Sequence, residues 1–214
     1  KMKKIYLVLL LTLVLGFVAG NKAQGQGDCQ NCPPQYPFCY ILNIPNDICP
    51  GEEQRTVKFC YNIENCPNRI DIYIMELEIG PECYFEFWDW FPNWIGNNIA
   101  SLCGYKPCDE PPPMEINYTV PICGRVEWYG SHRRLVYRYG EGSCDKRCVT
   151  KILWCMRGNQ SFWQIVNRTV IGNGNCPEIP YGDETEFPFT TDPNNPFYSW
   201  QLDCTKIDGV NCDD

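Results

Sequence analysis

The residues of this chain best suited to chemistry are its 16 cysteines, because histidine, the usual general base, occurs only once. Cys29-x2-Cys32 and Cys144-x3-Cys148 have the spacing of paired metal ligands, and four thiolates can hold a zinc ion. The first pair also matches the Cys-x-x-Cys of redox enzymes, but two prolines follow Cys32 where an activating helix would begin. Zinc binding and redox activity are therefore secondary interpretations beside structural disulfides.

Other candidates for catalysis are few. The sequence has no His-Glu-x-x-His, no Gly-x-Ser-x-Gly and no phosphate-binding glycine loop. The single histidine, His132, lies in an expected hairpin turn. Glu86 and Asp89 lie among aromatic residues, as the acids of a glycosidase do, but their spacing specifies nothing. Residues 208–214 offer carboxylates without the spacing of a calcium loop. We expect no catalysis, no bound metal and no cofactor.

The first 25 residues predict a secretory signal peptide. Three of the first four residues are lysines, and Ile5 to Ala19 form an almost unbroken apolar run. Ala23-Gln24-Gly25 then matches a small-x-small cleavage site. The apolar run is shorter than the ~20 residues that a membrane span needs, so an uncleaved anchor is the alternative interpretation. We expect a secreted or cell-surface protein that contacts no membrane after cleavage.

Export places the cysteines in an oxidising compartment, where such a density predicts a disulfide framework. The count is even, so every thiol can be paired, but one sequence leaves the pairing open. The disulfide candidates are Cys29, Cys32, Cys39, Cys49, Cys60, Cys66, Cys83, Cys103, Cys108, Cys123, Cys144, Cys148, Cys155, Cys176, Cys204 and Cys212.

The charge of the chain limits its partners. Without the four lysines of the leader, the 18 basic residues fall to 14 against 26 acidic ones, a net charge of −12. This balance argues against nucleic acid as a partner. Arg125 to Arg157 carry a net +5, whereas Pro177 to Asp214 carry −8. One interpretation is that each charged stretch is a solvated face. The other is that the acidic C-terminal stretch docks on the basic middle stretch, within one chain or between copies.

Periodicity predicts strands over most of the mature chain. Alternation of apolar residues marks a strand from Arg55 to Ile63. In the next run the apolar set shifts by one, from Ile70, Ile72 and Ile74 to Met75, Leu77 and Ile79, which predicts a β-bulge. Two hairpins are predicted, at 122–139 and at 148–171, and a late strand at 197–204. Residues 83–91 are read as a further strand, and 94–102 are the one helical candidate.

These patterns predict an all-β, disulfide-rich fold of antiparallel, β-sandwich-like units. We expect a signal peptide over 1–25, a Cys/Pro-rich, strand-poor cap over 26–50 and a first β unit over 51–108. A Pro-rich spacer over 109–114, a second β unit over 115–176 and an extended acidic arm over 177–214 complete the expected division.

The tryptophans are the strongest sign of a binding function. Trp88, Trp90 and Trp94 fall within seven residues, and alternate residues of a strand point to opposite faces, so a core cannot take all three. They are therefore candidates for contact with a ligand or partner, although core packing is the commoner role of such rings. The preferred function is a secreted structural or surface protein that self-assembles or adheres. The alternative is a carbohydrate-binding module with an exposed tryptophan platform.

Overall fold

The computed structural model describes residues 31–51, 55–80, 83–129, 134–139, 146–172 and 199–206. The predicted leader, the acidic residues 208–214 and His132 lie outside these residues. The strands are β1 (Phe38–Ile44), β2 (Arg55–Asn62), β3 (Arg69–Ile79), β4 (Met114–Pro121), β5 (Cys123–Tyr129), β6 (Arg134–Tyr139), β7 (Arg147–Arg157), β8 (Gln160–Ile171) and β9 (Ser199–Lys206). Two helices, α2 (Tyr84–Asn98) and α3 (Ala100–Cys103), separate β3 from β4. The expected all-β, disulfide-rich fold is confirmed.

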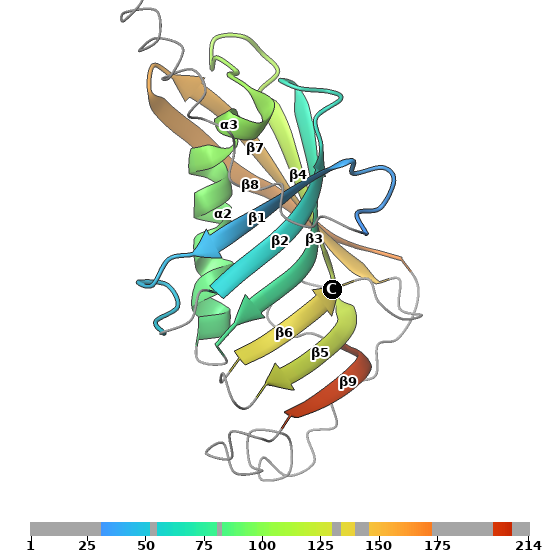
Figure 1. The fold of residues 1–214 in the computed structure, drawn as a ribbon. Coiled ribbons are helices and arrows are strands. Elements are labelled where there is room, and N and C mark those ends of the chain that lie inside the picture. Colours follow the sequence, from blue (N-terminus) through green and yellow to red (C-terminus); the bar gives the residue numbers. More distant parts are fainter. Residues whose placement is uncertain are drawn as a thin grey trace, which may run out of the picture.

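The described strands form one sheet that forks at β3 (Figure 1). The order along the main path is β8-β7-β4-β3-β6-β5-β9, with β2 and then β1 on the branch. The first part of β3, Arg69–Tyr73, pairs in parallel with β4, and the later part, Glu76–Ile79, pairs with β6 on the same side. All other neighbouring pairs are antiparallel. A single long strand thus joins two arms of the sheet.

The Pro-rich spacer does not end the sheet. It lies between α3 and β4 in the sequence. β4, which follows the spacer, pairs directly with β3, which precedes it. The expected cap also holds more regular structure than predicted, because β1 lies inside residues 26–50 and pairs with β2 along its whole length. Pro37 and Pro45 flank this strand, and the seven residues between them include no breaker.

The predicted β-bulge in β3 is confirmed. In the pairing of β2 with β3, Phe59 faces Ile74 but Lys58 faces Glu76, so Met75 is the extra residue. Because of this extra residue, Ile74 before the bulge and Leu77 and Ile79 after it are all fully buried. The bulge falls where β3 changes its neighbour from β4 to β6. A bulge bends its strand and increases the local twist, which suits a position at the fork.

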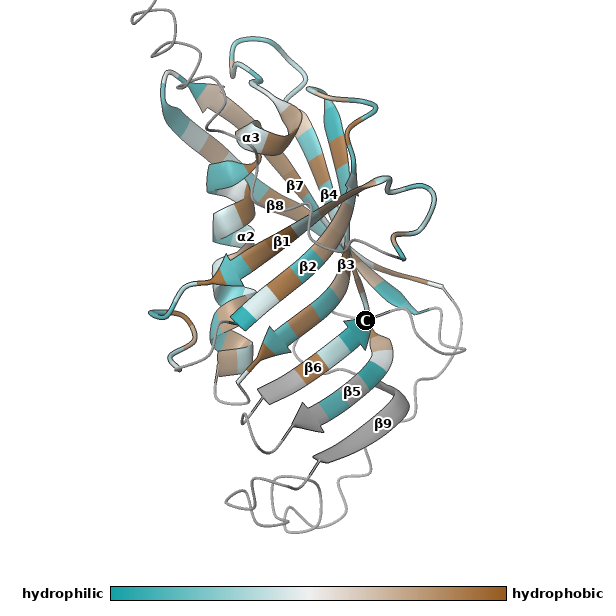
Figure 2. Cartoon of the chain, in the orientation of Figure 1, coloured by the Kyte–Doolittle hydropathy of each residue, from teal (hydrophilic) through white to brown (hydrophobic). Residues whose placement is uncertain are grey.

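Both predicted hairpins are confirmed, as is the late strand. β5 pairs with β6, and β7 pairs with β8 around Gly158, whose φ of 60° is in the left-handed region that glycine adopts without strain. The late strand is β9, which pairs with β5 at the end of the sheet. Alternating hydropathy along the strands is visible in Figure 2. Turn chemistry and period-two alternation were sufficient to find these elements.

The prediction of a strand at 83–91 is wrong, because this stretch belongs to helix α2. Tyr84, Phe87, Phe91 and Ile95 are all buried, at helical spacings of three and four residues. The aromatic composition, which is typical of strands, hid this period. Pro92 lies inside the helix, where proline costs about 3 kcal/mol. Packing against the sheet therefore stabilises this helix more than intrinsic propensity does.

Helix α2 covers one face of the sheet and contributes side chains to the core cluster, in the place that a second sheet takes in a sandwich (Figure 1). Phe91 contacts Phe59 on β2 and Tyr118 on β4, at ring distances of 6.3 and 6.0 Å. Full burial of a phenylalanine contributes about 1.5–3 kcal/mol. Among the described residues, no helix is long and apolar enough to cross a membrane.

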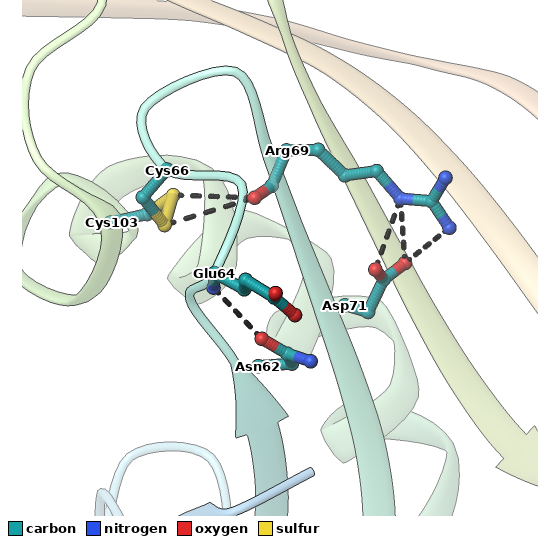
Figure 3. The surroundings of a disulfide bond; sticks show 6 residues. All are labelled: Asn62, Glu64, Cys66, Arg69, Asp71 and Cys103. Carbon is teal, nitrogen blue, oxygen red and sulfur yellow. Dashed lines mark hydrogen bonds and ion pairs between the residues drawn. A yellow bond between two sulfur atoms is a disulfide. The ribbon is translucent and has the colours of Figure 1, made fainter. Parts of the chain in front are cut away.

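Disulfides hold both ends of the helical segment. Cys83, which precedes α2, is bonded to Cys49 in the β1–β2 connection. Cys103, the last residue of α3, is bonded to Cys66 in the β2–β3 connection, and both sulfurs lie 3.7 Å from the Arg69 carbonyl oxygen (Figure 3). These bonds fasten the helical segment to the sheet at two separate points.

Candidate interaction surface

Among the elements whose side-chain burial is described, β8 is the most exposed long one, and it lies at one end of the main path of the sheet. Within the described residues its one neighbouring strand is β7. Its apolar side chains are unusually accessible: Phe162 is 42%, Ile165 36%, Val166 41% and Ile171 44% exposed. A long, exposed, apolar edge strand is a ready template for pairing with another strand.

β8 has little of the protection that edge strands usually carry. Its twelve residues include no proline, no lysine and no carboxylate, and Arg168 is its one charged residue. A register shift opposite Lys151 and Ile152 leaves Val166 as an extra residue, so β8 has one bulge between two regular runs. Charged residues, prolines and bulges protect an edge strand against pairing with other chains. In β8 this protection consists of one bulge and one arginine.

A shallow apolar groove of about 360 Å³ lies beside this edge. It is lined by Pro113, Leu153, Trp154, Cys155, Phe162, Trp163 and Gln164. Cys155 is bonded to Cys108, which ties the floor of the groove to the segment before β4. Arg157 stacks over the Phe162 ring at 5.7 Å and places a positive charge at the rim. The groove can therefore take an apolar side chain next to a basic edge.

Trp154 of β7 and Trp163 of β8 pack one face of the β7–β8 hairpin against helix α2. Trp154 Nε1 donates a hydrogen bond of 2.6 Å to the Gly96 carbonyl oxygen of α2. A Cβ atom at Gly96 would lie 2.3 Å from Trp163 Nε1, so only glycine leaves room for the ring. Ser161 donates a further hydrogen bond to Asn97. One face of the hairpin is thus rigidly packed, while its outer edge stays exposed.

A polar network covers the face of β3, β4 and β7 that lies opposite α2. Arg69 donates to both carboxylate oxygens of Asp71, and Asn117 donates to Asp71 and to Glu115. Lys151 forms an ion pair with Glu115, and this contact, followed by that of Asn117, holds the pKa of Glu115 below its usual value. The members satisfy one another across three strands, which is the behaviour of a structural network.

The three candidate tryptophans all lie on α2, half-buried against the core cluster. Trp94 contacts Tyr40 on β1 and Phe59 on β2, at ring distances of 6.0 and 6.1 Å. The prediction that a core cannot take all three rings because they alternate along a strand is wrong, since the segment is helical. Phe85, on the same helix, is the most exposed large apolar side chain described, at 70%. A ligand role for Trp88, Trp90 and Trp94 stays a prediction.

The described cysteines are oxidised. Four bonds are defined: Cys32–Cys60, Cys49–Cys83, Cys66–Cys103 and Cys108–Cys155. Cys39, Cys123 and Cys148 are also disulfide-bonded, and no described cysteine is free. Cys204 lies on β9, and Cys29, Cys144, Cys176 and Cys212 lie outside the described residues. The sulfurs of Cys32, Cys39 and Cys60 lie within 4.8 Å of one another, but in disulfides they offer no thiolate to a metal.

The carboxylates considered for catalysis lie on the surface of helix α2. Glu86 and Asp89 are exposed on α2, outside the groove. Phe162 and Trp163, which line the groove, were not among the predicted contact residues. One signal in the sequence could have found them: strand 160–171 has apolar residues on both of its faces. A strand with one buried face and one solvated face would instead alternate apolar and polar residues.

No protein-family model, no curated protein and no solved structure matches this chain.

Proposed function

We propose that this chain is a secreted structural or surface protein that acts by self-assembly or adhesion and has no catalytic role. The single observation that carries the proposal is β8, a twelve-residue strand at the end of the sheet with four exposed apolar side chains. Addition of a strand to such an edge supplies backbone hydrogen bonds along its length, and side-chain pockets supply specificity.

The groove beside β8 supports the same proposal. A strand that pairs with β8 covers Phe162 and places its side chains next to the groove formed with Pro113 and Leu153. Burying a large apolar side chain completely contributes about 1.5–3 kcal/mol, so covering half-exposed residues gives a useful fraction of that energy. The disulfides support assembly indirectly. The Cys108–Cys155 bond stabilises the folded sheet to which a partner strand would add.

The extracellular setting is supported by the disulfide density together with the predicted leader. Disulfides of this number persist in oxidising compartments and are rare in the cytosol. A protein with an all-β, cross-linked sheet and an exposed edge suits a surface layer, a fibre or an adhesive contact.

The first test measures assembly with one edge variant and one matched control. Sedimentation velocity of the oxidised mature protein, over a range of concentrations, should show species larger than the monomer. Phe162→Asp adds a charge to the exposed edge and should raise the apparent dissociation constant by about tenfold or more, which corresponds to about 1.4 kcal/mol.

Phe85→Asp is the control, since it makes the same substitution at an exposed position on α2, away from β8. It should leave assembly unchanged, and thermal unfolding should show that both variants fold. A wild-type protein that stays monomeric at all concentrations and adheres to no surface contradicts the proposed function.

Binding of carbohydrate is the second candidate function. The groove favours it because an exposed phenylalanine ring lies beside the side-chain amide of Gln164, a combination that suits stacking and hydrogen bonding of a sugar. A glycan array read with the wild-type protein and with Phe162→Asp and Trp90→Ala variants distinguishes the groove from the α2 tryptophans. Binding by the monomer would favour this function over self-assembly.

A further inference from the structure

We propose that two copies of this chain form a symmetric dimer in which β8 of one copy pairs with β8 of the other. The strands run antiparallel, and a two-fold axis passes through the bulge at Val166. This inference rests on the proposed function, because it names a second copy as the partner of the exposed strand. Within the described residues β8 has β7 as its one neighbouring strand (Figure 1). The sequence of β8 matches a second, inverted copy of itself, as follows from its faces and its side chains.

Strand β7 shows on which face of the sheet each residue of β8 lies. Alternate residues of β7 from Cys148 to Trp154 are buried, and Trp154 contacts α2, so they lie on the face that α2 covers. Facing residues of neighbouring strands share a face. The register of β7 with β8 therefore places Trp163, Ile165, Arg168 and Val170 on the α2 face. It places Phe162, Gln164, Asn167, Thr169 and Ile171 on the opposite face.

The bulge decides how β8 can pair with its own copy. Without a bulge, two identical antiparallel strands can pair only odd with odd and even with even residue numbers, because facing residues share a face. The extra residue Val166 exchanges the faces of odd and even numbers, so the first run, 160–165, matches the second run, 167–171, of the other copy.

The longest such pairing uses the whole strand. It places Gln160 of one copy opposite Ile171 of the other, and the numbers of facing residues then add up to 331. Five pairs lie on each side of the axis, ten in all, and the members of every pair share a face. Either run paired with its own copy gives at most five pairs. The bulge therefore favours pairing along the full length of β8.

The facing side chains are compatible in kind. Phe162 lies opposite Thr169 of the second copy, an aromatic and β-branched pair of the type that stabilises antiparallel sheets. Gln164 lies opposite Asn167, and two side-chain amides can exchange hydrogen bonds. At the axis Ile165 of each copy lies next to Val166 of the other, so side chains that are 36% and 41% exposed in the single chain come together. Apolar contact is thus concentrated at the centre of the interface.

Charge does not oppose this contact. Arg168 is the one charged residue of β8, and it lies opposite Trp163 of the second copy, where a guanidinium can stack on the indole ring. The two copies of Arg168 are five positions apart along the ladder, about 16 Å at the usual rise of a strand. This distance exceeds the screening length of about 8 Å at physiological salt, so their repulsion is weak.

The contact uses the same surface of both copies and therefore closes at the dimer. A two-fold axis perpendicular to the sheet reverses the direction of a strand and keeps its faces. Helix α2 of both copies then covers the same face of one continuous sheet.

The decisive experiment exchanges charges at the facing amides. In the variant Gln164→Lys/Asn167→Lys, each new lysine faces a lysine of the second copy, and in Gln164→Glu/Asn167→Glu each new glutamate faces a glutamate. Like charges at facing positions destabilise a pair of strands, so each variant alone should dimerise about tenfold more weakly than the wild type. When the two variants are mixed, opposite charges face each other twice. Native mass spectrometry should then find mainly heterodimers.

The matched control places the same charges at Asn43 and Asn46, which are exposed in and just after β1, on the branch of the sheet. These lysine and glutamate variants should dimerise like the wild type and mix without preference. Thermal unfolding checks that every variant folds.

Two results would overturn the β8 dimer while leaving self-assembly intact. One is random mixing of the two β8 variants with unchanged homodimers, and the other is wild-type assemblies that grow beyond the dimer with concentration. A wild-type protein that stays monomeric at all concentrations also overturns the dimer. The proposed function falls with it only if that monomer adheres to no surface.

Discussion

Gly96 shows how one residue positions the candidate surface. Its missing Cβ lets Trp163 of β8 approach the helix, and its carbonyl oxygen accepts the hydrogen bond from Trp154 of β7. A glycine inside a helix costs up to about 1 kcal/mol relative to alanine, so this position is maintained against helix propensity. The contact holds the β7–β8 hairpin on α2 and leaves the opposite edge of β8 exposed.

Gly96→Ala should therefore destabilise the fold. The new Cβ would lie 2.3 Å from Trp163 Nε1, and such overpacking typically costs about 1–3 kcal/mol, more than the gain in helix propensity. Chemical unfolding measures the difference. Asn93→Ala, at an exposed position of the same helix, is the control and should be neutral or slightly stabilising. An unchanged or raised stability for Gly96→Ala would show that the hairpin is not held at this point.

The Glu115 network should give a pH-dependent stability. Its contact with Lys151 lowers the pKa of Glu115 from its ordinary 4.5, so the folded state favours the carboxylate. The contribution is complete above pH 4.5 and is lost as the pH falls through the lowered folded pKa. Glu115→Gln should flatten the loss of stability in that acidic window by about 1 kcal/mol or less, since the pair is partly exposed.

Urea unfolding at neutral and acidic pH tests this expectation. The difference in stability between wild type and Glu115→Gln should shrink as the pH is lowered. A difference that stays constant from neutral to acidic pH would exclude Glu115 as the titrating group. Asp89→Asn, at an exposed acidic position on α2, is the matched control.

At the scale of elements, α2 and the disulfides at the ends of the helical segment act together. The helix has no side-chain hydrogen bond at its N-cap and contains Pro92, so its position depends on packing and on the bonds of Cys83 and Cys103. The Cys66–Cys103 bond spans 37 residues and encloses β3, α2 and α3 (Figure 3). A cross-link of this span restricts the unfolded chain substantially.

Replacing both Cys66 and Cys103 by alanine should lower the free energy of unfolding by about 2–4 kcal/mol. The measurement is guanidinium unfolding under oxidising conditions, with mass spectrometry to check that the other bonds are kept. The loss should reside mainly in α3 and the β2–β3 connection, where hydrogen exchange should increase. A variant as stable as the wild type would show that packing alone holds this end.

The prediction of a strand at 83–91 failed because two periods compete there. Seven of the nine residues in 83–91 are apolar. The stretch therefore fits both the two-residue period of a strand and the 3.6-residue period of a helix. The spacing of Tyr84, Phe87, Phe91 and Ile95 resolves the ambiguity, but only when the window extends past residue 91 into the expected helical candidate. In β3, by contrast, the phase shift at Met75 was visible locally and predicted the bulge correctly.

At the scale of the molecule, one forked sheet brings distant segments together. β3 pairs with β4 and β6 on one side and β2 on the other, so residues from every described region contribute to a single sheet. The two ends of the path are β8, whose one charged residue is Arg168, and β9, whose sequence holds one aspartate and one lysine.

The sequence by itself determined the β class, the two hairpins, the bulge and the oxidised cysteines. These features depend on alternation, turn residues and cysteine chemistry, which act over a few neighbouring positions. Tertiary structure alone decided the cysteine partners, the parallel contact of β3 with β4 and the helical covering of the sheet. It also decided that β8 has β7 as its one neighbouring strand within the described residues, because the neighbours of a strand depend on residues far away in the chain.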